Sequence, residues 1–159
     1  MGRRWQDLPP VARTLAEAVT DAVAAARAED EPALRAAADR LAGLDPTQPG
    51  RVLGDTVRLL LEQTHPDGLD ADDLRTVLGR CARWAAGWWP ETDPHVLAAL
   101  LTRALGVQPD PEAMPALTAQ QSATHAPLLL ADLLANSWLS LTDLLDAVFT
   151  ELRRSGEMD

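Results

Sequence analysis

The sequence predicts an all-α protein, a single-domain bundle of about seven helices with a buried helical hairpin at its C-terminal side. Alanine and leucine dominate the chain and tyrosine is absent, so helix-forming residues far outnumber strand-forming ones. Prolines and capping residues divide the chain into pieces of helix length. The 159 residues fit one domain with a core of its own. We therefore expect one domain over 1–159, with flexible ends at 1–8 and 155–159.

Three helices are predicted in the first part of the chain. The first helix begins at Pro9-Pro10 and runs to about Glu29, because apolar residues recur at helical spacing along it. Pro32 occupies the first turn of the second helix, which Asp45-Pro46 and Pro49-Gly50 end. The third helix then carries the apolar residues from Val52 to Leu61 and runs to about Thr64.

Two further helices follow a turn at 65–68. Asp70 with Asp73 three residues later predicts the capped start of the fourth helix. This helix runs to Trp88, and Pro90 forces Trp89 out of helical geometry. The fifth helix extends from the cap at Asp93-Pro94 to the stop at Gly106. The segment 107–123 is interpreted as an ordered loop or a single turn of helix.

The C-terminal hairpin, residues 124–152, is predicted to supply the deepest part of the core. Between Pro127 and Ala135 the only polar side chain is Asp132, so at ~100° per residue the leucines surround most of the helix. Ser140 and Asp143 form a capping-box-like start for the last helix. The side chains expected to lie deepest are Leu129, Leu130, Leu133, Leu134, Leu145 and Val148.

A helix that is apolar all round must be covered all round, either by the rest of the chain or by a second copy. The alanine-rich first two helices offer only thin cover, so we predict a homodimer. Its interface candidates are Leu129, Leu133 and Trp138 on the hairpin.

The charge distribution excludes several classes of partner. The net charge is −10, and residues 104–152 carry six acidic residues but no arginine. Nucleic acids and anionic membranes need clustered cations, so neither is an expected partner. The chain also lacks a run of about 20 apolar residues that could span a membrane. Its single cysteine leaves no intramolecular disulfide, which fits a cytoplasmic location.

Three histidines, at positions 65, 95 and 125, are numerous enough for a zinc site, but their placement argues against one. If successive helices run up and down, His95 lies roughly 15–20 Å from the other two, at the opposite end of the bundle. No HxxxH pair occurs on any predicted helix. We expect neither a metal ion nor any other cofactor.

No motif indicates catalysis. Cys81 lies between Arg80 and Arg83, which favour a thiolate, but it shares an apolar face with Val77 and Trp84, where burial favours the thiol. The serines lack a nucleophile elbow, and no glycine-rich phosphate loop is present. The chain is therefore interpreted as a protein that is not an enzyme.

The tryptophans are the best candidates for a binding site. Trp84 and Trp88 are one helical turn apart and Trp89 follows, so with Cys81 they could form one wall of an apolar ligand pocket. The alternative is that they fill core space beside the alanine-rich helices. Both interpretations stay open from sequence.

Two short segments resemble each other at a spacing of 60 residues. Residues 64–74 and 124–134 share six of eleven positions, including the Thr-His pairs that begin them. An internal duplication and a coincidence in a Leu- and Ala-rich chain both remain open, and a regular solenoid is not predicted.

The leading hypothesis is a non-enzymatic helical module that works by protein–protein interaction or regulation, with self-association through the hairpin. The alternative is a helical sensor or carrier that admits a small apolar ligand near Trp84 and Trp88.

Overall fold

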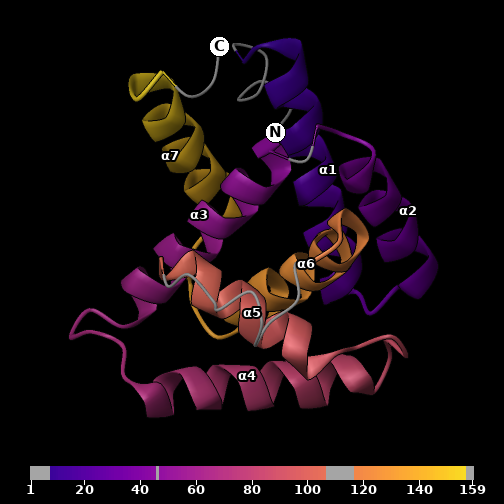
Figure 1. Cartoon of the computed structure of the whole chain (residues 1–159), viewed down its shortest axis with the longest axis vertical. Coiled ribbons are helices and arrows are strands. Elements are labelled where there is room, and N and C mark those ends of the chain that lie inside the picture. The colour runs from indigo at the N-terminus through magenta and orange to yellow at the C-terminus, as the bar shows by residue number, and fades with distance from the viewer. Residues whose placement is uncertain (1–7, 46, 107–116, 157–159) are drawn as a thin grey trace.

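The computed structural model describes residues 8–45, 47–106 and 117–156, and every regular element within these ranges is helical. Within the described ranges seven helices pack into one bundle, which confirms the predicted all-α architecture. Figure 1 shows their arrangement. The predicted flexible ends fall mostly on residues outside the described ranges. The helices are α1 (Pro10–Arg27), α2 (Glu31–Ala42), α3 (Thr47–Thr64), α4 (Ala71–Ala86), α5 (Pro94–Ala104), α6 (Ala119–Ala135) and α7 (Leu141–Arg154).

The capping residues expected from sequence begin three of the helices. Asp70 and Asp73 form a reciprocal capping box at the start of α4, with N–H to carboxylate distances of 3.0 and 2.8 Å. The Asp93 carboxylate accepts from the backbone N–H of His95 at the start of α5. Ser140 accepts from the N–H of Asp143 at the start of α7. Each cap satisfies a backbone donor that has no partner inside its helix.

The turn between α1 and α2 is only three residues long, because one residue serves both helices. The N–H of Asp30 donates to the carbonyl of Ala25, closing the end of α1, while the Asp30 side chain caps the start of α2. This geometry places Glu29 at a φ of 54°, a left-handed conformation that is strained for a side chain other than glycine. The short turn holds α1 and α2 as an antiparallel pair.

Two helices begin earlier than the sequence predicts. Helix α3 starts at Thr47, so Pro49 and Gly50 lie in its first turns rather than ending α2; a proline there removes no intrahelical hydrogen bond. Helix α6 starts at Ala119, where Thr118 and Gln121 form a capping box, and Pro127 lies inside the helix. An interior proline costs about 3 kcal/mol, which the burial of the helix from Ala123 to Leu134 offsets. Residues 107–116 of the predicted loop lie outside the described ranges.

Helix α6 is the centre of the bundle. Every residue from Ala123 to Leu134 is buried, and α1, α2, α3, α4 and α5 all pack against it (Figure 1). The six side chains predicted to be deepest are all buried, which confirms that expectation. Helix α7 packs instead mainly on α3 and to a lesser extent on α1. No helix in the described part of the chain is both long and apolar enough to cross a membrane.

The helices that pack around α6 contradict part of the dimer interface predicted from sequence. Leu129 and Leu133 are 0% and 2% exposed within the single chain, so neither side chain is available to a second copy. The prediction was wrong for these two residues because α1 and α2 are not alone over α6. Five helices surround it, and together they satisfy the apolar surface that was expected to need a partner.

Candidate functional site

Trp84, Trp88 and Trp89, here called the tryptophan cluster, lie together at the end of α4. The ring centroids of Trp84 and Trp88 are 5.6 Å apart, and those of Trp88 and Trp89 are 5.9 Å apart with an edge-on geometry. Both distances fall in the range where aromatic pairs attract. Trp89 is fully buried, whereas Trp84 and Trp88 are half-buried. The structure therefore brings together the three tryptophans that the sequence indicates, with only two of them partly open to solvent.

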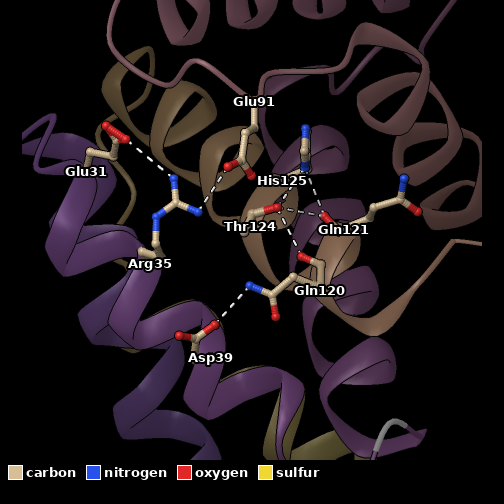
Figure 2. A network of polar contacts seen from close by, with 8 residues as sticks. All are labelled: Glu31, Arg35, Asp39, Glu91, Gln120, Gln121, Thr124 and His125. Atoms are coloured by element: carbon tan, nitrogen blue, oxygen red, sulfur yellow. Dashed lines mark hydrogen bonds and ion pairs between the residues drawn. The ribbon is translucent and has the colours of Figure 1, made fainter.

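Polar side chains from α2 and the α1–α2 turn attach to this cluster. The guanidinium carbon of Arg35 lies 4.7 Å from the Trp89 ring centroid, a cation–π geometry. Arg35 also forms ion pairs with Glu91 at 3.1 Å and with Glu31 at 3.4 Å, which Figure 2 shows. The indole N–H of Trp84 donates to the strained Glu29 at 3.3 Å. These contacts tie residues 87–93, the α4–α5 connection, to α2.

His125 of α6 lies beneath the same connection and is 3% exposed. Its Nδ1 lies 2.9 Å from the carbonyl oxygen of Gln121 and 2.8 Å from the hydroxyl of Thr124 (Figure 2). Its Nε2 accepts the backbone N–H of Asp93 at 3.0 Å. A carbonyl can only accept and an amide N–H can only donate, so the ring carries its proton on Nδ1 and is neutral. Burial, the largest cause, lowers the pKa of His125 below its ordinary value, which agrees with that state.

The position of His125 corrects the predicted arrangement of the histidines. Its ring bonds to Asp93, two residues before His95, whereas it was expected near His65 at the opposite end of the bundle. The expectation failed because α6 runs through the middle of the molecule instead of alternating with α5 along its edge. In the described ranges, no three His, Cys, Asp or Glu side chains are grouped so that they could hold a metal ion.

Cys81 belongs to the core and not to the edge of the tryptophan cluster. Its side chain is 0% exposed, and burial, together with the nearby Asp132 carboxylate, raises the pKa of the thiol to about 12. Arg80 lowers the pKa, but by less than burial raises it. At neutral pH the sulfur is therefore a protonated thiol, a weak nucleophile.

We expect Cys81 of the folded protein to resist thiol reagents. At pH 8 a disulfide reagent such as DTNB should label Cys81 far more slowly than a free cysteine. The reagent cannot reach the buried sulfur, and the sulfur is a thiol rather than the reactive thiolate. In denaturing urea one thiol per chain should react promptly. Rapid stoichiometric labelling of the native protein would contradict the burial of Cys81.

Two cavities lie at other places in the fold. One, of about 200 Å³, lies between α2, the start of α3 and the start of α6, and the other, of about 160 Å³, lies between α3, α4 and the end of α6. Neither is lined by Cys81 or by the tryptophan cluster. Both are below the ~300 Å³ typical of small-molecule pockets.

An ion pair that sequence analysis missed joins α4 to α6. Arg80 Nε lies 3.1 and 3.0 Å from the two carboxylate oxygens of Asp132, and Nη2 lies 2.7 Å from one of them. The Asp132 side chain is 5% exposed and that of Arg80 34% exposed. The signal was present in the sequence, because a lone carboxylate on an otherwise apolar helix must have a partner. The choice of Arg80 over Arg83 depended on the packing of α4.

Trp138 stands apart from every site described above. It lies in the short turn between α6 and α7 and is 95% exposed. Within the described ranges the other exposed large apolar side chain is Val11, at 56%. Of the three interface candidates, Trp138 alone is open to a partner.

No protein family model matches the chain, and no match was found among curated proteins or among solved structures.

Proposed function

We propose that this protein is a non-enzymatic interaction module that self-associates through the turn between α6 and α7. The observation that carries the proposal is the exposure of Trp138, at 95%. Tryptophan has a large apolar surface whose contact with water is unfavourable, and it is the residue type most enriched in the energetic centres of protein interfaces. The protonated, buried thiol of Cys81 further supports a role other than catalysis.

A two-fold contact between two copies suits the surroundings of this tryptophan. The neighbouring Leu139 and Leu141 are half-buried and extend the apolar surface of the turn. In a two-fold interface each copy contributes the same patch, so both Trp138 side chains are buried at once. Exposed acids on α7, such as Asp146 and Glu151, repel across the contact, but salt screens exposed charges beyond about 8 Å at physiological ionic strength.

Light scattering at tens of micromolar protein tests this proposal. We expect a mass near twice 17.1 kDa, and we expect Trp138→Ala to weaken association by about tenfold or more without loss of helix content. Val11→Ala is the matched control, because it truncates the other exposed large apolar side chain of the described ranges and should leave the mass unchanged. A mass of 17.1 kDa for the unmodified protein at these concentrations would contradict self-association.

The second candidate function is a sensor or carrier of a small apolar ligand near Trp84 and Trp88. It is favoured by the indole N–H groups of Trp88 and Trp89, which are buried and have no hydrogen-bond acceptor in the described part of the chain. A ligand with an acceptor oxygen beside its apolar part would suit them. Native mass spectrometry of the purified protein distinguishes this function, because a retained small molecule is expected only for a carrier or sensor.

A further inference from the structure

A hydrogen bond from a backbone N–H to the buried His125 side chain links the α4–α5 connection to the central helix. The N–H of Asp93 donates to Nε2 of His125 over 3.0 Å, and the imidazole that accepts it is 3% exposed. The ion pair of Glu91 with Arg35, in contrast, lies at the surface, with the two side chains 62% and 41% exposed. Asp93 is also the residue that caps α5, so this bond fixes the start of that helix.

The bond exists only while His125 is neutral. Its Nδ1 donates its proton to the Gln121 carbonyl, so Nε2 is the ring nitrogen that can accept the backbone N–H of Asp93. A second proton on Nε2 would place its N–H against the N–H of Asp93, so the bond to Asp93 could not form, and it would put a charge on a buried ring, which is unfavourable. We propose that His125 is an acid-sensitive latch, whose protonation releases the α4–α5 connection from α6.

The charges around the imidazole define how the latch responds. Burial lowers the pKa of His125 most. The backbone hydrogen bond with Gln121, the charge of Asp93, and the backbone hydrogen bond and charge of Glu91 each raise the pKa by less. From α2, Arg35 is neutralised by Glu31 and Glu91, and Asp39 accepts from Gln120 (Figure 2). On α6 the next ionisable residue is Asp132, which Arg80 of α4 neutralises.

Apart from the buried thiol of Cys81 on α4, which is protonated at neutral pH, the remaining ionisable groups on helices that pack against α6 are exposed or half-buried. On α1 these are Arg13, Glu17, Asp21 and Arg27, on α2 Arg40, on α3 Arg51, Asp55, Arg58 and Glu62, on α4 Asp72, Asp73, Arg75 and Arg83, and on α5 His95 and Arg103.

The direction of the pKa shift gives the sign of the effect. The released histidine titrates near 6.5, and in the closed state the pKa is lower. Release therefore takes up a proton, and the open fraction rises as the pH falls below about 6.5. Between pH 7.5 and pH 5.0 the equilibrium constant for opening should rise several-fold, with an upper limit of about 30-fold set by the 1.5 pH units below 6.5.

His65 is a matched control within the same chain. The hydroxyl of Thr64 lies 3.0 Å from Nδ1 of His65, and this nitrogen lies 3.0 Å from the carbonyl oxygen of Leu61, as in the Thr124-His125 pair. His65 differs in being half-buried and in having no backbone donor on Nε2 in the described part of the chain. Removing it takes away an imidazole of the same local geometry and leaves the latch in place.

Amide hydrogen exchange measured by NMR tests the latch. In the unmodified protein the protection of the Asp93 amide, corrected for the intrinsic pH dependence of exchange, should fall several-fold from pH 7.5 to pH 5.0. The amide of Leu130, in the middle of α6, should keep its protection. In His125→Gln the fall in Asp93 protection at low pH should be absent, and in His65→Gln it should remain.

Three outcomes would overturn the latch. The first is an Asp93 opening constant that changes less than twofold in the unmodified protein. The second is an equal loss of protection at Leu130, which would mean that acid unfolds the whole bundle. The third is a full response in folded His125→Gln. If His125→Gln does not fold, the first two outcomes still decide, because they need no variant at position 125.

Discussion

Arg80→Ala is expected to lower the free energy of unfolding by about 3–5 kcal/mol. The substitution removes three close contacts, of 3.1, 3.0 and 2.7 Å, to a carboxylate whose side chain is 5% exposed. Asp132 would then be a buried charge with its cation removed, and the cost of keeping it dehydrated would no longer be offset. Because α4 contacts the rest of the bundle mainly through α5 and α6, the same change should loosen the helix that ends at the tryptophan cluster.

Urea unfolding followed by circular dichroism measures this loss, and Arg75→Ala is its control. Arg75 also lies on α4 and is paired with Asp72 at 2.6 Å, but both side chains are largely exposed. The two substitutions change helix propensity equally, whereas an exposed pair contributes only about 0–1 kcal/mol. Equal losses for Arg80→Ala and Arg75→Ala would show that the Asp132 carboxylate reaches water in the folded protein.

The pair also shows what could be read from the sequence. A single aspartate among leucines indicates that a partner must exist, but several arginines on other helices could meet that need. Arg80 is the partner because α4 packs against α6 near the C-terminal end of α6. No local sequence pattern encodes where the two helices meet. Helix starts such as Asp70 and Ser140 were predictable because a cap depends on residues within one turn.

The tryptophans and His125 show the same contrast between contacts that the sequence predicts and contacts that it does not. Trp84, Trp88 and Trp89 are neighbours in the sequence, so their clustering followed from helical spacing. The bond between His125 and Asp93 joins residues 32 positions apart, and it depends on α6 passing through the centre of the bundle. The assumption that successive helices run up and down placed His125 near His65, whereas it contacts Asp93. Long-range packing, rather than local propensity, decides such contacts.

Leu129→Ala is expected to cost about 3–5 kcal/mol of unfolding free energy. Its side chain is 0% exposed on the central helix, and five surrounding helices cannot all move inward to fill the space that the lost methyl groups leave. Leu133→Ala should cost less, toward about 2 kcal/mol, because Leu133 already borders the 160 Å³ cavity beside α3 and α4. Leu100→Ala on α5, where the leucine is half-buried, is the control and should cost least.

The dependence of these losses on protein concentration separates a core role from an interface role for Leu129. If Leu129 is buried within one chain, its substitution costs the same free energy at every concentration, because association then adds equal stability to the variant and to the unmodified protein. A residue buried between two copies would lose more as the dimer becomes populated. We therefore expect urea midpoints of Leu129→Ala and of the unmodified protein to differ by a constant amount from 1 to about 100 micromolar. A difference that grows with concentration would show that Leu129 is part of the dimer interface. The helices that surround α6 would then have to move apart when two copies associate.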